Sequence, residues 1–472
     1  MTRDISRRLA QFLAAASYSD LPSLVIDHAK RAVLDWLGSA LAGSLEPPAR
    51  MARQCVSSLG ASDEATVFSG ARASASGAAL ANGVASHILE FDDIHKTSTV
   101  HAAAPVISAA IAVAEREHAD GRVFLLAVAL GYEAALRIGE AVNPSHYRYW
   151  HPTGTAATFG AAAAAGSLMR LSAAQMLDAL GSAGTQAAGL WEFNADGAMS
   201  KHLHPGKAAF NGILAADLAR LGFTGATRIL EGERGFFRAM SDSFDESRVT
   251  GGLGEHWKIA ENCYKLYPCC GHTHTAIDVA LDLRSQSQPL NPSWGGPPGP
   301  RRAPRPGASS HVEAPPHILI ETYAPGYEIV KNLAPSTPYQ AKFSIAYCVA
   351  VALLDGRVSL DQFSPDRLRD PAISALLERT QVLVAPDLTA KYPAAWPTRV
   401  TLTLASGVKL TGSADFPRGN PENPVSIAQL EEQFRSLVVP RFGAATAQRA
   451  IEAVQSLETR EDVSTLFRDL AR

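Results

Sequence analysis

The stretch Leu171-Ser-Ala-Ala-Gln-Met-Leu-Asp-Ala-Leu-Gly181 decides the fold class, because it contains both a helix start and a helix stop. Ser172 and Gln175 have the spacing of a capping box, in which the serine side chain accepts from the backbone N–H of the third helical residue and the glutamine side chain accepts from that of the cap. A glycine such as Gly181 is typical of a helix C-terminus. The stretch therefore predicts a helix that begins at Ser172 and ends near Gly181.

Outward from this stretch, the chain keeps a helical pattern from about residue 5 to residue 265. Alanine is used heavily in this half, which favours helices packed closely through small faces. Two more capping boxes, Ser359/Gln362 and Ser426/Gln429, predict helix starts in the second half, and the last fifty residues return to a helical pattern.

The pattern changes after about residue 284. Residues 285–316 are rich in Pro, Gly, Ser and Arg and predict a long exposed loop. The apolar, β-branched segment 317–323 predicts a strand, and residues 400–410 alternate around the turn Ser406-Gly407 as in a hairpin. Between them, residues 342–354 predict an amphipathic helix. Strands mixed with helices in this way indicate an α+β module.

A chain of 472 residues is too long for one compact core, so we expect more than one domain. The predicted fold class is mainly α with an inserted α+β domain: a large all-helical domain plus a smaller α+β lid domain. The predicted bounds are 1–265 for the first part of the helical domain, 266–418 for the lid with its Pro-rich loop 285–316, and 419–472 for the C-terminal part of the helical domain.

Composition and charge exclude several classes of protein. The net charge of −3 gives no reason to expect a nucleic-acid partner. Five cysteines without regular spacing argue against a disulfide framework. No apolar run has signal-peptide character or membrane-spanning length. We therefore expect a cytoplasmic protein without a membrane partner.

Histidines gather in one part of the chain, since eleven of the fourteen lie between His87 and His274. The pairs His202/His204, His272/His274 and Cys269/Cys270 are metal ligands by type. Structural zinc sites, however, separate paired ligands by two to four residues, and the HExxH motif is absent. The prediction is no metal, with a zinc-dependent hydrolase as a remote alternative.

Nucleotide binding has little support in the sequence. Gly206-Lys207 is similar to the end of a P-loop, but Lys201 stands where the first glycine is needed and Ala208 follows the lysine. No G-x-G-x-x-G follows a strand, and no G-x-S-x-G offers an activated serine. The predicted cofactor is therefore none.

Lysines, histidines and carboxylates remain, and together they suit proton abstraction next to a carboxylate. The enediolate that develops must be neutralised by fixed positive charge, which Lys201, Lys207 and Lys265 can supply. A histidine can transfer the proton, and Asp92 or Asp93 can orient that histidine. This chemistry predicts a small polycarboxylate as the substrate.

At these clusters the chain resembles the MmgE/PrpD family, whose members include 2-methylcitrate dehydratase, cis-aconitate decarboxylase and iminodisuccinate epimerase. The resemblance covers most of the chain outside 285–316. Its matching segments are Leu34–Gly38, His87–Asp93, Gly131–Glu133, His151–Gly154, Lys201–Ala209, Leu230–Gly232, Lys265–Asp278 and Lys342–Tyr347.

The resemblance implies a helical domain, a smaller α+β lid, a homodimer and an active site between the domains without metal or nucleotide. It implies an active-site set of acidic residues, two histidines, a lysine and a final histidine. From both lines of reasoning, the predicted catalytic residues are Asp93, His101, His151, Lys201 and His274. The predicted substrate-binding residues are Glu90, Asp92, Lys207, Lys265, His272 and Tyr149.

The predicted function is a cofactor-independent lyase that abstracts a proton α to a carboxylate of a small di- or tricarboxylate, as in a 2-methylcitrate dehydratase-like elimination. The alternatives are an epimerase or isomerase of a dicarboxylate, with Tyr147 or Tyr149 as an acid, and a cis-aconitate-type decarboxylase. The non-catalytic alternative is a binding scaffold that has kept the fold.

Overall fold

The protein is seen here as a computed structural model, which describes residues 4–286 and 316–466. The chain forms two units. Unit 1 is Met1–Tyr264 with Val425–Arg472, and unit 2 is Lys265–Pro424. Nearly all of the predicted loop 285–316 lies outside the described residues. No helix in the described ranges is both long enough and apolar enough to cross a membrane.

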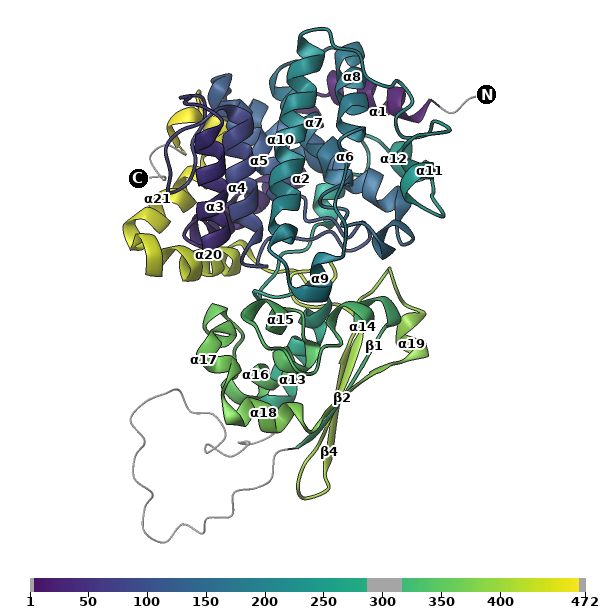
Figure 1. Ribbon diagram of the computed structural model, residues 1–472, viewed down its shortest axis with the longest axis vertical. Helices are drawn as coiled ribbons and strands as arrows, with labels where there is room; N and C mark the ends of the chain where they lie inside the picture. The colour runs from purple at the N-terminus through teal and green to yellow at the C-terminus, as the bar shows by residue number, and fades with distance from the viewer. Residues whose placement is uncertain (1–3, 287–315, 467–472) are drawn as a thin grey trace. The chain divides into compact units, whose positions relative to one another are not determined.

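Unit 1 is built from helices that come from both ends of the chain (Figure 1). Its α-helices are α1 (Ile5–Ala15), α2 (Ser23–Gly43), α3 (Pro47–Ser58), α4 (Ala75–His87), α5 (Ala103–Arg116), α6 (Gly121–Val142), α7 (Ala156–Leu168), α8 (Ala173–Gly184), α9 (Phe193–Asp196), α10 (Ser200–Arg220), α11 (Phe236–Met240), α12 (Ser247–Thr250), α20 (Ile427–Phe442) and α21 (Ala444–Gln455). Its short 3-10 turns are η1 (Tyr18–Asp20), η2 (His146–Arg148), η3 (Lys258–Glu261) and η7 (Leu457–Thr459). The prediction of a mainly helical fold with a smaller α+β part is confirmed.

Helix α8 begins as the sequence predicts, because Ser172 and Gln175 form the complete capping box. The predicted end at Gly181 is wrong, since α8 continues to Gly184. Gly181 is buried, and a Cβ there would lie 2.4 Å from the backbone nitrogen of Ala226. The glycine therefore serves a close approach to the segment beside it and does not end the helix.

Glycines set the closest helix crossings of unit 1. A Cβ on Gly160 of α7 would lie 2.6 Å from the carbonyl oxygen of Gly131 of α6. A Cβ on Gly83 of α4 would lie 2.7 Å from the Cα of Gly206 of α10. Because backbone touches backbone at this second crossing, α4 and α10 hold the side chains near their ends at fixed separation.

Unit 2 contains a four-stranded sheet in the order β2-β1-β3-β4. Its elements are η4 (Gly271–Thr273), α13 (His274–Gln286), β1 (His317–Thr322), α14 (Ala324–Val330), α15 (Pro338–Lys342), α16 (Ile345–Asp355), η6 (Leu360–Phe363), α17 (Pro365–Leu368), α18 (Pro371–Leu377), β2 (Thr380–Val384), α19 (Pro386–Thr389), β3 (Thr398–Thr403) and β4 (Lys409–Ala414). Strand β1 pairs parallel with β2 and antiparallel with β3, which forms a hairpin with β4.

The apolar side chains of β1 and β3 form one core with α13 and α16. Ile318, Ile320, Val400 and Leu402 are buried in this core, where each strand alternates buried and partly exposed residues. Every residue of α16 from Ile345 to Leu354 is buried, so the predicted amphipathic character of this helix is wrong. Packing against α13, α15, α18 and β2 leaves α16 no solvent face.

The capping box Ser359/Gln362 is present but starts only the 3-10 turn η6. Pro365 ends that turn, because the residue before a proline is disfavoured in helical conformation. The box Ser426/Gln429 starts α20 as predicted. Helix α20 packs on α2, where a Cβ at Gly38 would lie 3.0 Å from the ring of Phe434.

Candidate active site

Three segments of unit 1 supply the buried charged and histidine side chains of the candidate site. The first is the loop 88–102 between α4 and α5, the second is the segment around His151 before α7, and the third is the first two turns of α10. Helix α4 adds its last residue, His87. Polar groups are rarely buried unless each has a partner, so their interactions show what each can do.

Lys201 and Glu90 form a buried ion pair between α10 and the loop 88–102. The side chains are 2% and 1% exposed. Glu90 has φ of +58°, in the left-handed region that residues other than glycine seldom adopt. Such a conformation costs on the order of 1–3 kcal/mol and persists at sites where the surroundings hold it. The strained backbone turns the Glu90 carboxylate toward Lys201.

Asp93, two residues after Phe91, has a different environment. Its Oδ2 accepts hydrogen bonds from the Tyr132 hydroxyl at 2.5 Å and from Asn262 Nδ2 at 2.7 Å, and its Oδ1 accepts from the Ala103 backbone N–H at 3.1 Å. Burial raises the pKa of Asp93 to about 6. Both oxygens are held by the protein, so Asp93 fastens the start of α5, and the geometry favours Glu90 as the acidic residue that faces Lys201.

Asp92 lies between two histidines. Its Oδ2 is 2.7 Å from Nδ1 of His87 and 3.5 Å from Nδ1 of His101. The carbonyl oxygen of Asp93 also lies 2.6 Å from Nδ1 of His101. Since a carbonyl can only accept, Nδ1 of His101 carries the hydrogen, and in the neutral ring Nε2 carries the lone pair.

His87 donates its Nδ1 hydrogen to Asp92, and its Nε2 is buried without a hydrogen-bond partner among the described residues. This hydrogen bond fixes the orientation of the His87 ring, and the same Asp92 oxygen also faces His101. The ring centroids of His87 and His101 are 4.9 Å apart.

His151 is paired with a histidine and not with a carboxylate. Its Nδ1 lies 3.1 Å from Nδ1 of His204, and the rings of Trp191 and Phe193 pack around it. Burial lowers the pKa of His151 well below its usual value, and the positive charge of Lys201 acts in the same direction. Burial also lowers the pKa of His204 to about 3. Both rings are neutral at pH 7.

The predicted residues Lys265, His272 and His274 belong to unit 2. Lys265 is 1% exposed. His272 Nδ1 is hydrogen-bonded to the Tyr323 hydroxyl, and burial lowers the pKa of this histidine to about 3. His274 begins α13, and its Nε2 lies 3.3 Å from the carbonyl oxygen of Cys269, so that Nε2 is the protonated nitrogen. These three stay predicted members of the site.

Two predicted substrate-binding residues have other surroundings. Nζ of Lys207 donates to the carbonyl oxygens of Gln186 at 3.1 Å and Ala188 at 2.9 Å. Burial lowers the pKa of Lys207 to about 8. Tyr149 is 54% exposed, with the Arg148 guanidinium over its ring. The charge of Lys207 also lowers the pKa of His204, and Lys207 and Tyr149 both stay predicted members of the site.

Two clusters place ligand-type atoms within 4.8 Å of one another: His87, Asp92 and His101, and separately His95, Glu140 and Glu261. In the first, both Nδ1 atoms that face Asp92 already act as hydrogen-bond donors, and the His87–Asp92 distance of 2.7 Å is that of a hydrogen bond. Metal ligation needs these nitrogens deprotonated. The first cluster is therefore built for proton handling.

His87 and His204 are not among the predicted site residues. His87 stands five residues before Asp92, and that spacing was a usable signal. His204 was weighed as a metal ligand by type, and the spacing gives no signal for the contact of its ring with His151, 53 residues away.

Both parts of the chain match the models of a known protein family. The MmgE/PrpD N-terminal domain matches residues 7–248, and the MmgE/PrpD C-terminal domain matches residues 267–459. Human cis-aconitate decarboxylase is 27% identical over 99% of this chain and 94% of its own length. A cis-aconitate decarboxylase-like protein of Aspergillus oryzae is 27% identical, covering 98% of this chain and 96% of its own length. A 2-methylcitrate dehydratase of Cupriavidus necator is 28% identical over 40% of this chain and 36% of its own length.

Proposed function

Because the chain belongs to the MmgE/PrpD family, we propose that it is a lyase that decarboxylates a small unsaturated tricarboxylate of the cis-aconitate type. The predicted resemblance to this family is confirmed, and so is the prediction of an enzyme, since the relatives are decarboxylases and a dehydratase. Decarboxylation comes first because the decarboxylases align over nearly their whole length. The dehydratase-type elimination favoured by the sequence analysis becomes the second candidate.

The observation that carries the proposal is the buried Lys201–Glu90 pair on the same helix start as His202, whose ring lies 6.5 Å from that of His87. A buried ammonium whose partner is a carboxylate can exchange that partner for a carboxylate of the substrate. The substrate carboxylate would take the hydrogen bond that Glu90 now accepts, and the buried ammonium would supply fixed positive charge to the anion that develops.

His101 is the proposed proton donor. Protonated at Nε2, it gives that proton to an alkene carbon of the substrate, where a C–H bond forms. The C–C bond to one carboxylate breaks, its electrons form the new double bond, and carbon dioxide leaves. Asp92, 3.5 Å from Nδ1, stabilises the imidazolium before the transfer. In the dehydratase reaction the same Nε2 would take a proton, so one arrangement serves either direction.

His151 and His204 are neutral and can donate or accept hydrogen bonds without adding charge. We propose that they orient the substrate, and that His272, His274 and Lys265 of unit 2 complete its recognition as the family resemblance implies. The homodimer that the resemblance also implies is testable by light scattering of the purified protein.

The test follows substrates by NMR in D2O with purified protein. We expect cis-aconitate to lose carbon dioxide and to gain one deuterium on carbon in the product. If 2-methylcitrate eliminates water and cis-aconitate stays unchanged, the dehydratase candidate is correct. Stoichiometric zinc in the purified protein would favour the zinc hydrolase alternative, and turnover that is insensitive to a chelator would rule it out. A panel that shows no exchange, elimination or loss of carbon dioxide would overturn the lyase proposal.

A further inference from the structure

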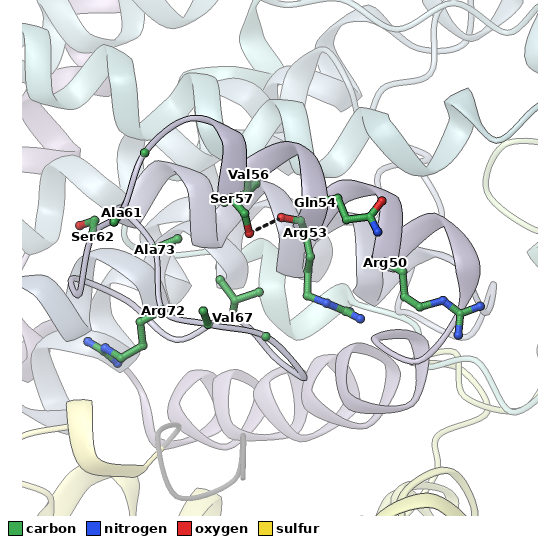
Figure 2. A pocket seen from close by; sticks show the side chains of 13 residues that line it. Arg50, Arg53, Gln54, Val56, Ser57, Ala61, Ser62, Val67, Arg72 and Ala73 are labelled. Atoms are coloured by element: carbon green, nitrogen blue, oxygen red, sulfur yellow. Dashed lines mark hydrogen bonds between the residues drawn. The ribbon is translucent and has the colours of Figure 1, made fainter.

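A charged cavity lies in unit 1 between α3 and the loop that follows it, residues 60–73 (Figure 2). Its volume is about 580 Å³, within the roughly 300–1,000 Å³ of small-molecule sites. Arginines line it from two sides: Arg50 and Arg53 extend from the same side of α3, and Arg72 comes from the facing loop (Figure 2). No aspartate or glutamate is among the described residues that line it.

The three arginines differ in how their charge is balanced. Arg72 is neutralised, with Nε 2.5 Å from Asp63 and Nη1 2.7 Å from Glu115. Arg50 and Arg53 have no ion-pair partner in the part of the chain that the structure describes. They stand three residues apart on one helix, where like charges repel. The cavity therefore carries about two positive charges that the surrounding protein does not offset.

Arg53 is held in place as a binding group would be. Its Nη1 donates to the carbonyl oxygen of Ser44 at 2.5 Å. Its aliphatic stem passes Gly70, where a Cβ would lie 2.7 Å from Cδ of Arg53. Burial and the nearby Arg50 both lower the pKa of Arg53. An arginine fixed beside a like charge is stabilised by an anion that accepts from both guanidinium groups.

The loop that forms the opposite wall is anchored. Asn82 of α4 accepts from the Phe68 N–H at 3.1 Å and donates to the Thr66 carbonyl at 2.8 Å. Ala65 and Ala73 form an isolated antiparallel bridge. The wall is thus tied to α4 and to itself, so the cavity exists before any ligand arrives. Gln54, Ser57 and Ser62 add neutral polar groups to the lining.

We infer that this cavity is a binding site for a small multivalent oxyanion, separate from the Lys201–Glu90 site. The guanidinium fork matches carboxylate and phosphate groups alike, and the two free charges match a ligand with at least two negative charges. The class therefore includes polycarboxylates and phosphate compounds, and the experiment distinguishes them.

Isothermal titration calorimetry of the full chain with inorganic phosphate and, separately, with the unreactive tricarboxylate tricarballylate tests the inference. We expect one of the two probes to bind the wild type, and Arg50→Gln/Arg53→Gln to weaken that binding about tenfold or more, because charge-assisted bonds to arginine are strong. Arg53→Lys, which keeps the charge but loses the fork, should fall between the two.

Two further variants separate this cavity from the proposed active site. Lys201→Ala should leave binding at the arginines unchanged, whether or not the proposed reaction is correct. Arg7→Gln, which removes an exposed arginine already paired with Asp4 at 2.8 Å, is the matched control and should also change nothing. The inference is overturned if neither probe binds, if Arg50→Gln/Arg53→Gln binds as the wild type does, or if Lys201→Ala abolishes the binding.

Discussion

Two buried ion pairs of unit 1, Glu133–Arg137 and Glu90–Lys201, differ in what surrounds the cation. The Arg137 guanidinium donates to Glu133 and to the backbone carbonyls of Gly251, Gly252 and His256. Its donors fasten a loop onto α6. The Lys201 ammonium instead joins α10 to a strained loop residue, 111 positions away in the sequence.

Equal burial therefore does not mean an equal role. A guanidinium whose fork is filled by carbonyls cannot turn toward a ligand without releasing the loop. An ammonium on a flexible stem can change partner while the backbone stays in place. We therefore predict that Arg137 contributes mainly to the stability of the fold and Lys201 mainly to the activity.

Lys201→Ala should have the largest effect, a loss of turnover of about 10³-fold, because fixed positive charge at a developing anion contributes about 10²–10³-fold or more. Lys207→Ala is the control on the same helix, since that ammonium is bound to two carbonyl oxygens, and it should lower turnover only a few-fold. Steady-state kinetics with circular dichroism checks both. Equal losses of turnover in the two variants would refute the proposal that the Lys201 ammonium binds the substrate.

Arg137→Met should destabilise the fold, by about 3–5 kcal/mol, because it leaves the buried Glu133 without its cation. Urea unfolding measures the change. The turnover of the protein that remains folded should stay close to that of the wild type. If the variant is as stable as the wild type but inactive, the division of roles between the two ion pairs fails.

Asp92→Asn should lower turnover by about 10²-fold, within the usual range for a group that supports proton transfer. Without the carboxylate the imidazolium of His101 is less stable, so the proton donor forms less readily. His87→Gln keeps an N–H donor for Asp92 and should lower turnover only a few-fold. Steady-state kinetics of both variants checks this, and equal losses would contradict the pairing of Asp92 with His101.

The smallest effect concerns pH and stability. Burial raises the pKa of Asp93 to about 6 from 3.8. A carboxyl with a raised folded-state pKa destabilises the fold above that pH and regains stability as the pH falls from 6 toward 3.8. Relative to Asp93→Asn, the wild type should gain up to about 1.4 kcal/mol of unfolding free energy per pH unit in that window. Denaturant unfolding at pH 7.5 and 5 checks this, and a constant difference would contradict it.

Local features of the fold could be predicted because their causes are local. The capping boxes at Ser172 and Ser426 and the strand at 317–322 depend on neighbours a few residues away. The helix end predicted at Gly181 was wrong because this glycine is needed for a tertiary contact, the close approach of Ala226. The burial of α16 on every side depends on what surrounds it, and a short apolar helix does not reveal that.

Only part of the candidate site could be predicted from the sequence, for the same reason. Lys201 and His101 stand out by residue type and motif. Glu90 and Asp93, however, are both acidic residues and stand three positions apart. Their roles differ because the backbone at Glu90 is left-handed, and a glutamate gives no sign of that conformation in the sequence. The contact between His151 and His204 joins segments more than fifty residues apart, so spacing could not predict it.

The touching backbones at Gly83 and Gly206 have a consequence for anyone who redesigns this protein. The distance between α4 and α10 is fixed at this crossing, because even one methyl group on either glycine must push the two helices apart. His87 is the last residue of α4 and Lys201 lies in the first turn of α10. Such a change would therefore alter the distance between these two side chains while most of the packing stays intact. A library of variants that is screened for solubility or thermal stability would keep substitutions at Gly83 or Gly206 that abolish activity. An assay of turnover would be needed to remove them.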